Sequence, residues 1–142
     1  MVDALHRARE LLLTGGYIAD IHPTPELAHL EVQIDNQVEH LGDRPDSADP
    51  TSPALRHRAA DAAIATCVNA GVLSIAAETE CSIHTYADSV DELRAWLDTK
   101  WKQPPFDERT FERAAEALSL EPSGRLRVRE QVRFTHLFPT RR

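Results

Sequence analysis

Asp20 and His22 are the residues whose types and spacing best suit chemistry in this chain, and Tyr17 lies close before them. Residues 17 to 21 are mostly apolar and predict a short strand. Ligands of open α/β sheets bind at the carboxyl ends of strands. His22 could therefore act there as a general base or donate a hydrogen bond to a substrate, because imidazole exchanges protons near neutral pH. The alternative interpretation is a solvated loop histidine before Pro23.

A second pair of candidates, His84 and Tyr86, ends a long predicted strand over residues 72 to 86. A role in ordering the following turn is the alternative for this pair. A metal bound by His22, His29 and Glu31 is not expected, because the intervening prolines impose no helical spacing and no cysteine joins the set. The substrate-binding candidates are Tyr17, Asp20, His22, His84 and Tyr86, with His22 the catalytic candidate.

The segment from Leu11 to Asp20, Leu-Leu-Leu-Thr-Gly-Gly-Tyr-Ile-Ala-Asp, resembles a part of the class I S-adenosylmethionine-dependent methyltransferases. In that family a helix ends in a Leu-x-Pro-Gly-Gly turn, and the fifth strand follows and often closes with Asp. Leu12, Gly15, Gly16 and Asp20 fit this pattern, while Thr14 replaces the proline. The predicted elements that follow are similar in order to the C-terminal part of the family.

The resemblance implies an α/β fold with a partial Rossmann-like methyltransferase sheet flanked by helices. Its strands would correspond to the fifth, sixth and seventh of the family, with the last strand inserted antiparallel between the other two, and a small hairpin would be added. Residues 1 to 142 are expected to form a single, truncated methyltransferase-like domain. In the family, the region of His84 and Tyr86 borders the substrate pocket.

The resemblance also implies that the donor-binding half would precede Met1. The chain has five glycines and no G-x-G, so we expect it to bind no cofactor alone, and S-adenosylmethionine only if a partner supplies the missing half. One expectation for function is the C-terminal, substrate-side part of a small-molecule methyltransferase that is not catalytic alone. The other is a non-enzymatic dimerisation or interaction module. The expected partners are a second copy, a complementing methyltransferase-like chain, or a small-molecule substrate.

The composition argues against several other classes of protein. A net charge of −7 and a pI near 5.4 argue against a nucleic-acid partner. No apolar stretch approaches the ~20 residues of a membrane span, and no signal peptide is evident, so we expect a cytoplasmic protein without a membrane partner. Cys67 and Cys81 are expected to be reduced, buried thiols.

Helical spacing predicts helices over residues 2 to 13 and 53 to 70, the first packed on a sheet and ended by Gly15 or Gly16. Ser52 is the predicted N-cap of the second helix, and Gly71 its stop. The predicted buried stripe of this second helix is Leu55, Ala59, Ala62, Ala63, Thr66 and Ala70. Between these helices, alternation predicts a strand over residues 30 to 34, a turn at Asp35-Asn36 and a return strand to Leu41.

The strand over residues 72 to 86 has an apolar row and a polar row, and so does the last strand, residues 125 to 134. Antiparallel pairing of the two would place arginines 125, 127, 129 and 133 opposite Glu78 and Glu80. The two strands are therefore predicted to be neighbours. The predicted apolar row of the first is Leu73, Ile75, Ala77, Thr79, Cys81 and Ile83.

Two short helices are predicted between these strands. Ser89 and Glu92 form a capping box for the first, whose inner face is Leu93, Trp96, Leu97 and Trp101. Pro104 and Pro105 break it. Asp107 is the predicted cap of the second helix, with Phe106 and Phe111 in a hydrophobic staple.

Overall fold

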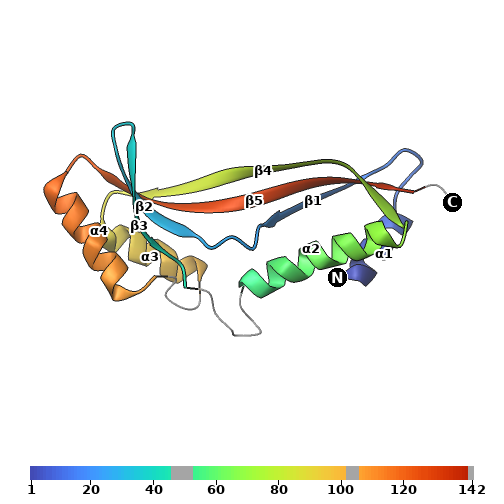
Figure 1. The fold of residues 1–142 in the computed structure, drawn as a ribbon, viewed down its shortest axis with the longest axis horizontal. Helices are drawn as coiled ribbons and strands as arrows, with labels where there is room; N and C mark the ends of the chain where they lie inside the picture. Colours follow the sequence, from blue (N-terminus) through green and yellow to red (C-terminus); the bar gives the residue numbers. More distant parts are fainter. Residues whose placement is uncertain (46–52, 102–105, 141–142) are drawn as a thin grey trace. The chain divides into compact units, whose positions relative to one another are not determined.

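The computed structural model describes residues 1–45, 53–101 and 106–140, and within these residues the fold is mixed α/β (Figure 1). It has four helices and a five-stranded, largely antiparallel open sheet. The elements in chain order are α1 (Val2–Glu10), β1 (Ile18–Pro23), β2 (His29–Ile34), β3 (Gln37–Asp43), α2 (Pro53–Asn69), β4 (Leu73–Ala87), α3 (Val90–Lys100), α4 (Glu108–Leu120) and β5 (Arg125–Pro139).

The chain divides into two compact units. Unit 1 comprises Met1–Glu26, Ser47–Cys81 and Gln131–Arg142, and unit 2 comprises Leu27–Asp46 and Ser82–Glu130. The strands β4 and β5 therefore contribute residues to both units. A single methyltransferase-like domain over residues 1 to 142 stays a prediction.

The sheet of unit 1 consists of β1, the second half of β5 and the first half of β4. β1 pairs antiparallel with β5, from Ile18 opposite Leu137 to Pro23 opposite Val132. β4 pairs with the same stretch of β5 and runs antiparallel to it. The Thr140 amide donates to the Val72 carbonyl, and the Arg133 side chain donates to Glu80, so residue numbers rise along β4 as they fall along β5. Both strands pair with one stretch of β5, so they lie at its two edges. The structure confirms a mixed α/β fold with a largely antiparallel open sheet, and the parallel strand order of a Rossmann sheet is not shown.

Helices α1 and α2 lie on one side of the unit 1 strands (Figure 1). The core between helices and sheet contains Leu5, Ala63, Ile64, Cys67, Leu73 and Leu137. The predicted stripe of α2 is wrong at Ala59, Ala62, Thr66 and Ala70, which are exposed, whereas Ala60, Ala63, Ile64 and Cys67 are buried. The helix instead turns its larger apolar side chains inward, since Ile64 buries more apolar area than alanine.

Helix α1 ends at Glu10, three residues before the predicted end. Leu11 and Leu13 are exposed, so no packing favours a further turn there, and Gly15 adopts a left-handed φ of 82° before β1. At the other helix the prediction holds: α2 ends at Asn69 and Gly71 has a φ of 65°. The predicted cap Ser52 lies outside the described residues, as do Pro104 and Pro105.

Unit 2 contains the predicted hairpin, β2 and β3, joined at Asp35 with a left-handed φ of 51°. The hairpin is part of the main sheet, because β2 pairs antiparallel with the first half of β5. The buried face of this part of the sheet carries Leu30, Val32, Leu126 and Val128. The same core contains Leu93 and Leu97 of α3, Phe106 just before α4, and Phe111 and Ala114 of α4.

The helix caps of unit 2 are confirmed. The Ser89 side chain accepts from the Glu92 amide at 3.1 Å, and the Asp107 carboxylate accepts from the Thr110 amide at 2.8 Å. Phe106 and Phe111 are in ring contact at 6.3 Å, as the staple predicts.

Two predictions about exposure are wrong. Cys67 is buried as expected, but Cys81 is exposed, and neither forms a disulfide. In the predicted apolar row of β4 only Leu73 is buried, because β4 is exposed from Ser74 to His84. Among the described residues, no helix is long and apolar enough to cross a bilayer.

Candidate functional site

His22 lies between two carboxylates in unit 1. On β1, Asp20 and His22 point to the same side of the strand, since residues two apart share a face. The Nδ1 atom of His22 is 2.5 Å from Oδ2 of Asp20, and its Nε2 is 3.0 Å from Oδ1 of Asp61 on α2. The imidazole is 9% exposed. The structure thus brings Asp20 and His22 together, as predicted, and adds Asp61.

Arg133 extends this group across the sheet. It is the cross-strand partner of His22 on β5. Its Nη1 donates to Oδ1 of Asp61 at 2.7 Å, and its Nε and Nη2 donate to Oε1 of Glu80 on β4 at 2.9 and 2.7 Å. The hydrogen bonds to Glu80 raise the pKa of the Arg133 guanidinium above its usual value. We call Asp20, His22, Asp61, Glu80 and Arg133 the His22 network.

The chemistry open to this network follows from its hydrogen bonds. Each ring nitrogen of His22 faces a carboxylate oxygen, so in this arrangement neither is left to take a proton from a substrate. Four carboxylates, those of Asp20, Asp61, Glu78 and Glu80, lie within ion-pair distance of Arg133 or His22, and Asp61 is the one that comes from α2. The geometry suits an ion network that holds α2 on the sheet, and a general-base role for His22 stays a prediction.

Tyr17 does not join the network. It precedes β1 and its ring contacts those of His136 and Phe138 on β5, with centroids 4.3 and 6.1 Å apart. In the β1–β5 register His136 lies opposite Ala19, on the side of the sheet away from Asp20. The predicted trio of Tyr17, Asp20 and His22 is therefore divided between two faces.

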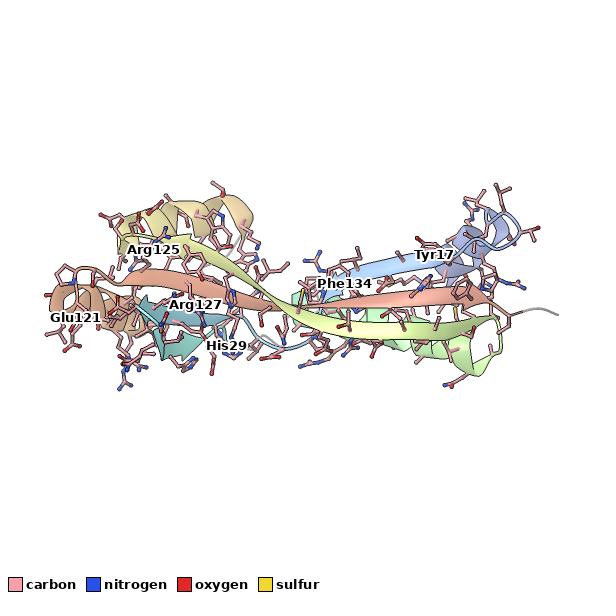
Figure 2. The ribbon with its side chains drawn as sticks, turned by 90° about the horizontal axis from the view of Figure 1, so that it is seen from above. Tyr17, His29, Glu121, Arg125, Arg127 and Phe134 are labelled. Carbon is pink, nitrogen blue, oxygen red and sulfur yellow. The ribbon has the colours of Figure 1, made fainter. Side chains whose placement is uncertain are left out.

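The face of unit 1 that carries Tyr17 is covered by no helix among the described residues of unit 1 (Figure 1). The β1–β5 register and the ring contacts of Tyr17 assign eight members: Tyr17, Ala19, Ile21, Pro23, Val132, Phe134, His136 and Phe138. On β4, Glu78 and Glu80 contact Thr135 and Arg133 on the other side of the sheet, so we place Ala77, Thr79 and Cys81 on this face. We call this set the outer face. It contains no Asp, Glu, Lys or Arg. Tyr17 is 55% exposed, Ile21 59% and Phe134 38% (Figure 2 labels Tyr17 and Phe134).

His84 and Tyr86 lie in unit 2, with ring centroids 6.3 Å apart. The Tyr86 hydroxyl donates to the Gln33 side chain at 3.1 Å, and Arg125 stacks over the tyrosine ring at 5.2 Å. Partial desolvation and then the positive charge of Arg127 lower the pKa of His84. The pair is exposed and borders a polar surface.

Glu31 anchors this polar surface of unit 2. It is nearly buried, and its two oxygens accept from Nε of Arg127 at 2.7 Å and Nε of Arg129 at 3.1 Å. Burial alone would raise the pKa of Glu31, but the hydrogen bonds and charges of the two arginines lower it below 4.5. The predicted opposition of arginines and glutamates across β4 and β5 is confirmed for Arg133, whereas Arg127 and Arg129 pair with β2 instead.

A further polar group lies where β2 begins and β3 ends. Oδ1 of Asp43 is 2.5 Å from Nδ1 of His29 and 3.2 Å from Nε2 of His40. Among the described residues, this trio is the group of histidines and carboxylates whose donor atoms gather closely enough to hold a metal. No metal was expected at His22, His29 and Glu31, and this trio shares only His29 with that set.

Sequence reasoning missed Asp61, His40 and Asp43. Asp61 is the one acidic residue of α2, inside a run of alanines, and an acidic residue in such a run is a usable signal. The placement of His40 and Asp43 on one face depends on a β-bulge, at which the pairing shifts between Leu30 and Glu31. No sequence pattern indicated this bulge.

Comparisons with protein-family models, curated proteins and solved structures found no match to this chain.

Proposed function

We propose that the protein is a non-enzymatic self-association module that forms a homodimer through the outer face of unit 1. The observation that carries this proposal is the outer face itself. Eleven side chains without a formal charge lie on one side of a three-stranded sheet, in a chain with 27% charged residues. An antiparallel sheet with one solvated face normally alternates apolar and polar residues. Here the face without a covering helix is mostly apolar, with Thr79 and His136 among its polar members.

The size and composition of the outer face support association. With strands about 4.8 Å apart and alternate residues about 6.8 Å apart, the face extends over roughly 300 Å². Patches of this size on monomers are often functional. Aromatic side chains are enriched in the cores of interfaces, and Tyr17, Phe134 and Phe138 supply three here.

A second copy is the occupant that best fits this face. A two-fold interface joins the same patch of both chains, so the patch must be complementary to itself. Charged patches meet this condition poorly because like charges would meet, and each chain carries a net charge of −7. The outer face avoids that repulsion and buries no unpaired ion. Two such faces would bury about 600 Å² together, well below a standard interface, so the proposed association is weak and reversible.

Sedimentation analysis of the purified chain from low to several hundred micromolar tests the proposal. The average mass is expected to rise from 15.9 kDa toward twice that value. Phe134→Lys is expected to hold the mass at the monomer value, because it places a charge at the centre of the face. Leu120→Lys, at an exposed leucine of α4 in unit 2, is the matched control and is expected to dimerise like wild type. A wild-type mass that stays at 15.9 kDa, or a Phe134→Lys chain that still dimerises, refutes the proposal.

A second candidate is the C-terminal part of a class I S-adenosylmethionine-dependent methyltransferase. The observation in its favour is that β5 runs antiparallel between β1 and β4, the order that the resemblance implies for strands seven, five and six. On this proposal the partner is a chain with the donor-binding half, and Asp20 and His22 border the substrate. Calorimetric titration of S-adenosylmethionine is expected to show no binding to the chain alone, and binding once a complementing chain is added. Saturable binding to the chain alone would contradict this assignment.

A further inference from the structure

The residues at the open end of the β2–β3 hairpin form a compact donor set. In the register of the hairpin His29 lies opposite Asp43, and His40 lies opposite Glu31. The extra residue at the bulge, Leu41, points into the core and is buried. The bulge therefore returns Asp43 to the side of the sheet that carries His40.

We infer that His29, His40 and Asp43 bind a divalent transition-metal ion in unit 2. Their donor atoms are Nδ1 of His29, Nε2 of His40 and one carboxylate oxygen of Asp43, and all three lie within 4.8 Å of one another. Ligand atoms of a tetrahedral zinc ion, each about 2.1 Å from the metal, are about 3.4 Å apart. The observed separations of 2.5 and 3.2 Å from Asp43 and the 4.8 Å limit bracket that value.

The chemistry of the donors selects the class of ion. Two imidazoles and one carboxylate suit Zn²⁺, Ni²⁺ or Co²⁺, whereas Mg²⁺ and Ca²⁺ prefer oxygen ligands alone. Three protein ligands leave at least one coordination position for water. An imidazole binds a metal through a ring nitrogen that carries no proton, so the ion competes with protons for these donors.

The surroundings permit a cation. Two arginines lie beside the site: Arg129 is the cross-strand partner of His29 on β5, and Nη2 of Arg113 donates to the His40 carbonyl oxygen at 3.3 Å. Nε of Arg129 is directed to Glu31, whose carboxylate partly neutralises it. His40 and Asp43 are about half exposed, so their side chains can adjust by fractions of an ångström to reach a common ion.

Calorimetric titration of zinc chloride into the tag-free, chelator-treated full chain tests the site. One equivalent is expected to bind. His40→Ala and Asp43→Asn are each expected to weaken binding by at least about tenfold, because the first removes a ligand and the second replaces an anionic ligand with a neutral one. Both residues are at the surface, so the variants are expected to retain wild-type circular dichroism. His6→Ala, at an exposed histidine of α1, is the control and is expected to bind like wild type.

Cobalt supplies a second readout that does not depend on heats. Co²⁺ bound by two imidazoles and a carboxylate is expected to give visible d–d absorption that is lost in His40→Ala and kept in His6→Ala. Absence of saturable zinc binding would overturn the inference and leave the trio as a hydrogen-bonded cluster. Binding that persists unchanged in both His40→Ala and Asp43→Asn would overturn it as well, because the ion would then be held elsewhere.

Discussion

His22 and Arg133 lie directly opposite each other on β1 and β5, and both contact the same oxygen of Asp61. One carboxylate of α2 thereby joins two strands of the unit 1 sheet. The Nε2 of His22 is 3.0 Å from that oxygen, and Nη1 of Arg133 is 2.7 Å from it. The position of α2 on the sheet is thus set by an ion network as well as by the apolar contacts of Ile64 and Cys67.

Replacing Asp61 with Asn is expected to destabilise the protein by about 2 kcal/mol, because two charge-assisted hydrogen bonds lose their anionic acceptor. Urea unfolding measures the change. Asp3→Asn, at an exposed position of α1, is the control and is expected to stay within about 0.5 kcal/mol of wild type. Equal stability of the Asp61→Asn and wild-type chains would show that the network does not hold the helix.

The Glu31 carboxylate is expected to make stability depend on acid pH. Its pKa in the folded protein lies below 4.5, its usual value. The unfolded chain therefore binds the proton more readily, and the stabilisation is fully present above pH 4.5 and is lost as the pH falls through the lower, folded value. Glu31→Gln is expected to cost about 2 kcal/mol near pH 7 and to show a smaller deficit below pH 4.5. Denaturation at a series of pH values measures both, and a deficit that is constant with pH would contradict the assignment.

Gly42 leaves no room for a side chain. A Cβ built there would lie 2.6 Å from Oγ1 and 2.8 Å from Cγ2 of Thr110 on α4. Gly42→Ala is therefore expected to destabilise the protein by about 1 to 3 kcal/mol through overpacking. Adding Thr110→Ala is expected to recover part of that loss. The double variant should therefore lose less free energy of unfolding than the two single variants lose in sum. Strict additivity would show that the two residues do not compete for space.

Cys81 provides a reporter of self-association. It is exposed in the single chain and belongs to the outer face, whereas Cys67 is buried in the unit 1 core. A thiol reagent is expected to modify one cysteine quickly and the other only after unfolding. The fast reaction is expected to slow as the protein concentration rises, and to lose that dependence in Phe134→Lys. A rate that does not change with concentration in wild type would argue against burial of this face.

Local signals in the sequence predicted much of the fold. The Asp35-Asn36 turn, the caps at Ser89 and Asp107, and the stop at Gly71 follow from the side chains and backbone freedom of single residues. The pairing of β4 with β5 followed from matched alternation and opposite charges. These features depend on neighbours in sequence or on one strand partner.

Features that depend on a third element were not predictable in the same way. The apolar row of β4 indicated a buried face, but burial requires a helix to cover it, and none of the described helices of unit 1 does so. The end of α1 was misplaced because Leu11 and Leu13 have nothing to pack on. Within the His22 network, Asp20 and His22 were predicted as a pair, and so was the contact of Arg133 with Glu80. Asp61 was missed, because it comes from a helix whose rotation the sequence left open.

The pairing of β1 with β5 has a consequence for biosynthesis. The first strand of the chain has the last as its neighbour, so Ile18 must wait until Leu137 has left the ribosome before it finds its partner. Contacts of such long sequence separation slow folding, since a long loop must close before they form. Until β5 has been synthesised, β1 therefore lacks the partner that it has in the folded sheet.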